Sequence, residues 1–293
     1  MASAVRQRKR PGRGEGVIAD LRDIALRSAP ALLLVILGEF VLPRRQPVWS
    51  STLIRALGEC GVEAVAARKA IQRTAERGTI TDVRHGRKVR WMLTGTGTTM
   101  ITKGAERVLG FTGETREWDG TWLIVNTTVP ESHRNLRYHL RTRLTWAGMG
   151  SPAPGTWISP HAARADEVAG IITGLGLADW SMSYVGRFGP VGDERRTVQR
   201  AWDLEDLHRH YAEFLQQFRL AAVDDEASAF RQQVELVQAY RRFPYLDPAL
   251  PAALTSGGWI GVEAAKLFHS KRSEWSEQAH RYWERLCAET EGG

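Results

Sequence analysis

The segment that most constrains the fold is residues 80–94, which read ITDVRHGRKVRWMLT. Two runs of β-branched and apolar residues flank Gly86, a pattern typical of two short strands joined by a turn. We therefore predict strands at residues 79–84 and 88–94. Both strands carry cationic residues towards their junction, so the turn forms a basic tip.

Three helical patterns precede this hairpin. The predicted helices are residues 25–42, a segment that starts at Ser50 or Ser51 and stops at Gly61, and residues 62–77, which end before Gly78. Serine is a common N-cap, and glycine and proline commonly follow the last turn of a helix. Three short helices followed by a hairpin are the element order of a winged helix-turn-helix.

The third helix has one apolar and one cationic face. Ala67, Ala70, Ile71 and Thr74 share the first face. Arginine and glutamine on a helix can read base edges in the DNA major groove, and cationic tips can contact phosphates. The predicted DNA-binding residues are Arg68, Lys69, Gln72, Arg73, Arg77, Arg84, His85, Arg87, Lys88 and Arg90. A solvated helix and hairpin without a partner is the alternative interpretation.

Positive charge is concentrated in the first third of the chain. Residues 1–92 contain 18 Lys and Arg against 8 Asp and Glu, whereas residues 93–293 contain 22 against 25. A local basic field favours a polyanionic partner for this part alone. Residues 1–24 include an Arg-, Gly- and Pro-rich stretch, and we predict a basic flexible arm that either contacts nucleic acid or is a solvated tail.

The rest of the chain divides into two patterns. Residues 121–129, 155–160 and 180–189 predict strands, and residues 132–149 and 164–177 predict the helices between them. This alternation suits a small ferredoxin-like α/β sandwich. From residue 201 the pattern is helical, with a proline-rich break at FPYLDPALP and two further helices at residues 262–271 and 274–288.

Several stretches resemble the PaaX family of bacterial repressors over about residues 25–285. The stretches are LGEFVLPRRQPVWSSTLIRAL, AARKAIQRTAERGTI, REWDGTWLIVNTTVPESHRNLRYHLRTRLTWAGMG, APGTWISPH, AWDLEDL and RRFPYLDPALPAAL. Within the basic helix, Arg68, Ala70, Arg73 and Gly78 match the family pattern. Thr74 and Thr79 depart from it, because the family usually has leucine and tryptophan there.

The resemblance implies an α+β multidomain chain. Its expected parts are the arm at residues 1–24, a winged helix-turn-helix DNA-binding domain at 25–98, a ferredoxin-like domain similar to Cas2 at 110–198, and a helical C-terminal domain at 199–288. It also implies a homodimeric repressor that binds double-stranded operator DNA and is released by an acyl-CoA such as phenylacetyl-CoA.

Two alternative functions are a Cas2-like nuclease and an architectural DNA-binding protein without an effector. A metal-dependent nuclease needs carboxylates to hold the ion, yet the first carboxylate after residue 120 is Glu131. His208 and His210 have the wrong spacing for one helical face, and GTGT at residues 95–98 lacks the lysine of a phosphate loop. We interpret GTGT as a flexible exit from the hairpin, and we predict no catalytic residues, metal or cofactor.

The segment YRRFPYLDP is a candidate effector site. Arginines could bind the phosphates of a CoA, and aromatic rings could line an apolar pocket for its acyl group. The predicted effector-binding residues are Tyr240, Arg241, Arg242 and Tyr245, with Arg187 as a second phosphate candidate. The alternative is that one of the adjacent arginines pairs with Asp247 to brace a turn.

The apolar run at residues 29–37 is too short to span a bilayer and is predicted to be a buried helix. No small-residue cleavage site follows it. Cys60 and Cys287 lie far apart and match no metal-binding motif. We therefore expect a cytoplasmic protein.

Overall fold

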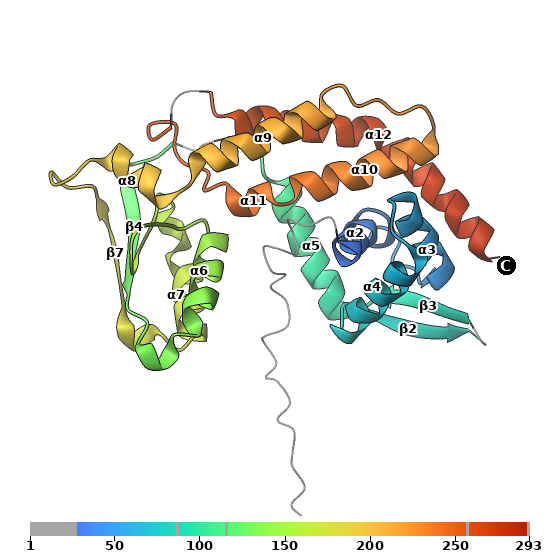
Figure 1. Ribbon diagram of the computed structural model, residues 1–293, viewed down its shortest axis with the longest axis horizontal. Coiled ribbons are helices and arrows are strands. Elements are labelled where there is room, and N and C mark those ends of the chain that lie inside the picture. The colour runs from blue at the N-terminus through green and yellow to red at the C-terminus, as the bar shows by residue number, and fades with distance from the viewer. Residues whose placement is uncertain (1–27, 86–87, 115–116, 256–257, 292–293) are drawn as a thin grey trace, which may run out of the picture. The chain divides into compact units, whose positions relative to one another are not determined.

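The computed structural model describes residues 28–85, 88–114, 117–255 and 258–291. The chain folds into two compact units. The first extends to Lys103 and includes the chain from Glu289 onward, and the second comprises Gly104–Ala288. Figure 1 shows the elements of each unit. The predicted basic arm at residues 1–24 lies outside the described residues.

The first unit begins with the three predicted helices. They are α2 (Ala29–Ile36), which continues as the π-helix η1 (Leu37–Val41), α3 (Ser50–Glu59) and α4 (Ala64–Glu76). Ser28 caps α2, because its Oγ accepts a hydrogen bond from the Ala31 amide at 3.4 Å. The three helices pack on one another around fully buried Leu33, Leu53 and Leu57. The predicted helix order is confirmed.

The predicted hairpin is also present. Its strands are β2 (Ile80–His85) and β3 (Lys88–Leu93), which pair antiparallel, and the short β1 (Val48–Trp49) pairs with β3 on the other side. The N-cap prediction for α3 was wrong, since Trp49 holds the cap position without a side-chain bond. The Ser50 hydroxyl instead donates to the Val89 carbonyl and accepts from the Trp91 indole, which ties α3 to β3.

GTGT is not a flexible exit, because it forms the first turn of helix α5 (Gly95–Leu109). The Thr94 hydroxyl accepts a hydrogen bond from the Gly97 amide at 2.9 Å and so satisfies one unpaired donor at the helix start. Gly97 lies directly against the Thr79 carbonyl, and a Cβ there would collide with it. The glycine therefore serves close packing rather than flexibility.

The second unit contains a four-stranded antiparallel sheet. Its strands are β4 (Thr121–Thr127), β5 (Gly150–Ala153), β6 (Thr156–Ser159) and β7 (Ser181–Arg187), in the order β5-β6-β4-β7. Helix α6 (Leu136–Trp146) follows β4, and α7 (Ala165–Gly174) follows β6. This β-α-β-β-α-β order is that of a ferredoxin-like sandwich. Strand β5 was missed, because its sequence GSPA has no β pattern.

The two faces of the sheet have separate cores. Leu123 and Val125 of β4 point to the side covered by α6 and α7, where they pack with Leu140 and Leu144. The alternate residue Trp122 points to the other side, where the buried cluster includes Ile158, Val198, Leu250 and Leu254. Val198 belongs to α8 (Glu194–Ala201), so the expected domain boundary at residues 198/199 falls inside a helix.

Four further helices follow, and the last of them extends past Ala288, where the second unit ends. They are α9 (Leu204–Phe218), α10 (Glu226–Tyr240), the single turn α11 (Phe243–Leu246) and α12 (Ile260–Glu291). Figure 1 shows α9, α10 and α12 lying lengthwise together. The prediction of two final helices was wrong, since α12 is continuous. No proline or glycine interrupts residues 271–274, and Lys271 pairs with Glu274 across the expected break at 3.2 Å.

Candidate nucleic-acid interface and ligand cavity

Helix α4 presents a continuous polar face. Ala67, Ala70, Ile71 and Thr74 are buried against the other helices. The exposed side chains include Arg68, Lys69, Gln72, Arg73 and Arg77, together with the acidic Glu76. The sequence predicted one apolar face and one cationic face on this helix, and the structure buries the first and exposes the second. Residues at i, i+3 and i+4 share one side of a helix, which is why the spacing was informative.

The cations on this face have no anionic partners of their own. Within the part of the chain that the structure describes, Arg68, Lys69, Arg73 and Arg77 make no ion pair or side-chain hydrogen bond. Gln72 makes a long hydrogen bond of 3.4 Å to Glu76, one turn on. Four positive charges and an amide are thus available to a ligand at this surface.

The two threonines that depart from the family pattern are both accommodated. Thr74 is buried, and its hydroxyl donates to the Ala70 carbonyl at 2.8 Å, so no buried polar group is left unsatisfied there. Thr79 is also buried, and its carbonyl accepts from the Thr94 amide at 3.1 Å. Backbone and hydroxyl hydrogen bonds therefore hold the junction between α4 and β2, at positions where the family pattern has larger apolar side chains.

The predicted hairpin residues have different surroundings. Arg84 and His85 belong to β2, and His85 pairs in register with Lys88. Arg87 lies outside the described residues. Lys88 is exposed, whereas the Arg90 guanidinium lies 4.0 Å from the centre of the Trp49 ring. This cation–π contact holds Arg90 on the sheet.

Two of the predicted effector residues are packed into the protein. Tyr240 is fully buried, stacks on Phe268 with ring centres 3.9 Å apart, and donates its hydroxyl to the Phe111 carbonyl. Tyr245 packs on Trp146 and beneath the Arg107 guanidinium. Both rings therefore have structural contacts in the absence of any ligand.

The predicted arginines do not gather at one place. Arg241 and Arg242 lie between α10 and α11 and are half-buried, and burial lowers the pKa of the Arg242 guanidinium. Arg187 is exposed at the end of β7. The assignment of these residues to an effector remains a prediction.

Asp247 braces the proline-rich turn, as the alternative interpretation proposed, but through other partners. Its buried carboxylate accepts hydrogen bonds from the Tyr211 hydroxyl at 2.8 Å, the Trp259 indole at 2.7 Å and the Ala249 amide at 2.7 Å. Burial raises the pKa of the Asp247 carboxyl, and these three donors act against that rise. The turn is fixed by a buried polar network that the sequence did not predict.

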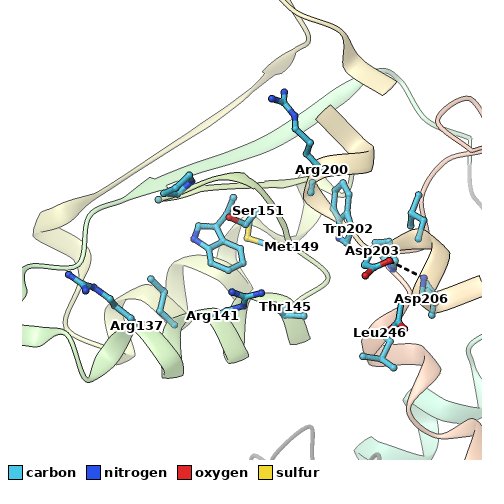
Figure 2. Close-up of a pocket in the computed structure, with 18 of the residues that line it drawn as sticks. Arg137, Arg141, Thr145, Met149, Ser151, Arg200, Trp202, Asp203, Asp206 and Leu246 are labelled. Carbon is cyan, nitrogen blue, oxygen red and sulfur yellow. Dashed lines mark hydrogen bonds between the residues drawn. The ribbon is translucent and has the colours of Figure 1, made fainter. Parts of the chain in front are cut away.

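A cavity of about 700 Å³ lies within the second unit. It is lined by α6 and by the residues where α8 ends and α9 begins. Its walls include Leu140, Met149 and Trp157 from the ferredoxin-like sandwich, Trp202 from the link between α8 and α9, and Leu207 from α9. Figure 2 shows Arg137, Arg141 and Thr145 along α6 on one side, and Trp202 and Asp203 on the other. None of the five predicted effector residues lines it.

Sequence reasoning missed this cavity because its lining comes from segments far apart in the chain. One local signal was available: Arg137, Arg141 and Thr145 repeat every four residues beside the apolar stripe Leu136, Leu140 and Leu144. That spacing places a cationic row next to a buried row on one helix.

Metal and membrane sites find no support in the described part of the chain. Across residues 28–85, 88–114, 117–255 and 258–291, no cluster of three or more His, Cys, Asp or Glu side chains is placed to hold a metal ion. In the same residues, no helix combines the length and the apolar content needed to cross a bilayer.

Comparisons with known proteins agree across the chain. Three family models match in order: the PaaX-like protein model at residues 28–97, the PaaX protein central Cas2-like domain at 115–198, and the PaaX-like protein C-terminal domain at 202–285. The transcriptional repressor PaaX of Escherichia coli strain K12 is 26% identical over 252 residues, which cover 82% of this chain and 78% of that protein.

A solved structure has a related fold. The uncharacterized protein Rv0674 from Mycobacterium tuberculosis aligns with a TM-score of 0.57, covering 85% of this chain and 97% of the other. Sequence identity is 19%, so this likeness concerns the fold alone.

Proposed function

This chain belongs to the PaaX family, and from that premise we propose that it is a transcriptional repressor that binds double-stranded operator DNA. The observation that carries the proposal is the exposed face of α4, where Arg68, Lys69, Arg73 and Arg77 have no anionic partner in the described chain. Unpaired cations on one helix suit a polyanion, because each phosphate contact releases condensed counterions.

We infer that residues 25–98 act as a winged helix. Helix α4 would enter the major groove, where Arg68 and Arg73 can donate to guanine and Gln72 can pair with adenine. Lys88, with Arg84, His85 and Arg87, would reach the DNA backbone from the hairpin. Arg90 would support this contact indirectly, because its guanidinium lies on Trp49.

The test is binding of the intact protein to DNA from the region upstream of its own gene. A specific operator should bind about 10³-fold or more tightly than random DNA of equal length at the same salt concentration. Equal affinity for the two DNAs would favour the alternative of an architectural protein. Cleavage of either DNA with a divalent metal would favour the nuclease alternative, although β4 contains no carboxylate.

We also propose that an acyl-CoA, most simply an aryl one such as phenylacetyl-CoA, releases the repressor. A ligand can shift an equilibrium only by its difference in affinity between two states. A typical coupling would lower operator affinity by about 5- to 150-fold. Operator titrations with and without a panel of acyl-CoAs test this, and a panel without any effect would refute the effector class.

A homodimer is the third element of the proposal, and β7 is the surface that fits it. This strand is at the edge of its sheet, and Met182, Tyr184 and Val185 are 62%, 52% and 59% exposed. Residues 181–186 carry no charge, so two copies of β7 can pair antiparallel without opposing like charges. The contact would be isologous, as two-fold dimers require.

Light scattering of two variants tests this contact. Tyr184→Glu should convert the dimer to a monomer, because pairing would bury two opposed carboxylates. Tyr138→Glu, an equally exposed tyrosine on α6, serves as the matched control and should leave the dimer intact. A dimeric Tyr184→Glu variant would remove β7 from the interface.

The remaining assignments follow from the same proposal. Residues 110–198 would form the Cas2-like domain and residues 199–288 a helical domain, and together they would carry the dimer contact and the ligand response. A repressor acts on chromosomal DNA, so we place the protein in the cytoplasm.

A further inference from the structure

The cavity beside α6 combines an apolar floor with a cationic wall. Leu140, Met149 and Trp157 are 4%, 1% and 7% exposed, so the floor belongs to the core of the ferredoxin-like sandwich. Trp202 contributes a second indole, which is held against Gly150 and stacks on Trp122. Two fixed aromatic rings in a partly open cavity suit a flat apolar group.

The cationic wall is the row that Arg137 and Arg141 form along α6, with Thr145 next in the row (Figure 2). Arg137 pairs with Glu131 at 2.6 Å. Within the described residues, Arg141 makes neither an ion pair nor a hydrogen bond, and its side chain is exposed.

The carboxylates at the cavity are already engaged. Asp203 caps α9 and accepts from the Asp206 amide at 2.9 Å. Asp206 pairs with Arg209 and lies 3.6 Å from the ring of His210. Asp203 keeps its negative charge, because a backbone amide does not neutralise a carboxylate, but the two guanidinium groups of Arg141 and Arg200 outnumber it at the cavity. The cavity therefore favours an anion over a cation or a neutral ligand.

We propose that this cavity binds an organic anion with a planar apolar body. The body would lie between Trp157 and Trp202, and the anionic group would accept hydrogen bonds from Arg141. Guanidinium groups recognise carboxylates and phosphates through paired N–H donors, which adds direction to the attraction. The volume of about 700 Å³ is within the range of small-molecule sites.

A role for this site in releasing operator DNA rests on the proposed function. Its two walls come from α6 and from the segment that joins α8 to α9, so a ligand would bridge both. An aryl acyl-CoA has the required flat group and anionic phosphates, and an aryl carboxylate has both features in a smaller molecule. Ligand binding in the cavity and release of DNA are distinct properties, and different measurements test them.

Isothermal titration of the full-length protein with phenylacetate, phenylacetyl-CoA and free CoA tests the site. At least one of the two aryl compounds should bind, and Arg141→Ala should weaken that binding by about 10- to 100-fold, the usual worth of a charge-assisted hydrogen bond. Arg134→Ala is the matched control: this exposed arginine precedes α6 and does not line the cavity. It should bind as wild type does.

Thr145→Phe provides a second variant that leaves the charge unchanged. Its ring should obstruct the cavity beside Arg141 and weaken binding, while circular dichroism and operator affinity stay at wild-type values. The proposal is overturned if neither aryl compound binds the wild type, or if Arg141→Ala and Thr145→Phe both bind as tightly as wild type. Ligand binding that depends on Arg141 but leaves operator affinity unchanged would support the site and refute the effector role.

Discussion

Arginine has different roles in the two units of this protein. On α4, Arg68, Arg73 and Arg77 are exposed, and none has a partner in the described chain. In the second unit, Arg107 donates to the Trp146 and Pro244 carbonyls, and Arg164 donates to the Ala147 carbonyl. The first set offers charge to a ligand, whereas the second set satisfies backbone groups inside the fold.

This difference shows that a count of basic residues does not identify a nucleic-acid surface. Burial and existing partners decide whether a cation is available. Burial lowers the pKa of the Arg107 guanidinium, and its hydrogen bonds bind it to two backbone segments, so it cannot serve DNA. Arg141 differs from Arg107 and Arg164, because its side chain is exposed, has no partner in the described residues and lines a cavity, and for these reasons we place a ligand there.

The largest expected effect is on stability and belongs to the internal polar network. Asp247→Ala should lower the free energy of unfolding by roughly 3 kcal/mol, because it leaves the Tyr211, Trp259 and Ala249 donors unpaired in a buried place. Urea unfolding followed by tryptophan fluorescence measures this. Asp224→Ala removes an exposed carboxylate and should change little; equal effects of the two substitutions would contradict the network.

The next effect concerns base recognition. Arg73→Ala should weaken operator binding by about 1–3 kcal/mol and relax the preference for the operator over random DNA. Arg195→Ala, an exposed arginine on α8, removes the same charge and should leave both quantities unchanged. Fluorescence anisotropy titrations with both DNAs measure the difference, and wild-type affinity in Arg73→Ala would exclude Arg73 from recognition.

The hairpin should have a smaller effect that does not depend on sequence. Lys88→Ala should weaken binding to every DNA alike and make the slope of log affinity against log salt shallower by roughly one unit. Lys266→Ala on α12 is the control with equal charge. An unchanged slope for Lys88→Ala would mean that the hairpin tip does not contact phosphates.

The smallest effect concerns acid stability in the second unit. Partial burial, aided by the positive charge of Arg242, lowers the pKa of His210 below 6.5. The folded protein therefore binds a proton at His210 less readily than the unfolded chain does. The stability that depends on a neutral His210 is present above pH 6.5 and is lost as the pH falls below that value. His210→Gln should show a smaller drop in melting temperature than wild type between about pH 7.5 and about pH 5.5. His208→Gln, an exposed neighbour, should behave as wild type.

The sequence predicted local structure better than the contacts between distant segments. The helix order before the hairpin and the strand pair at residues 80–93 follow from short periodic patterns, and the structure contains them. The helical start at Gly95 was missed because Gly97 is needed for close packing on Thr79, which no local pattern reveals. The sequence has no proline or glycine at residues 271–274, so the predicted break there lacked a local cause and α12 is continuous.

The same contrast between local patterns and distant contacts applies to the candidate sites. The cationic face of α4 is a property of one helix, so residue spacing was enough to find it. The cavity needs α6, Met149, Trp157 and Trp202 together, and only the fold brings them to one place. Tyr240 looked like a pocket residue in the sequence, yet its ring completes an aromatic core with Phe268.

We expect the cations of α4, which have no partner in the described residues, to bind DNA. The most direct test is the salt dependence of operator affinity for two variants in which four basic residues are replaced by alanine. The first variant replaces Arg68, Lys69, Arg73 and Arg77, and the second replaces Arg134, Arg195, Arg196 and Lys266. The first should lose operator specificity, with a salt slope shallower by roughly two units because only Lys69 and Arg77 among its four residues are left for phosphate contacts, while the second keeps the wild-type slope. Equal slopes and affinities for the two variants would contradict this expectation.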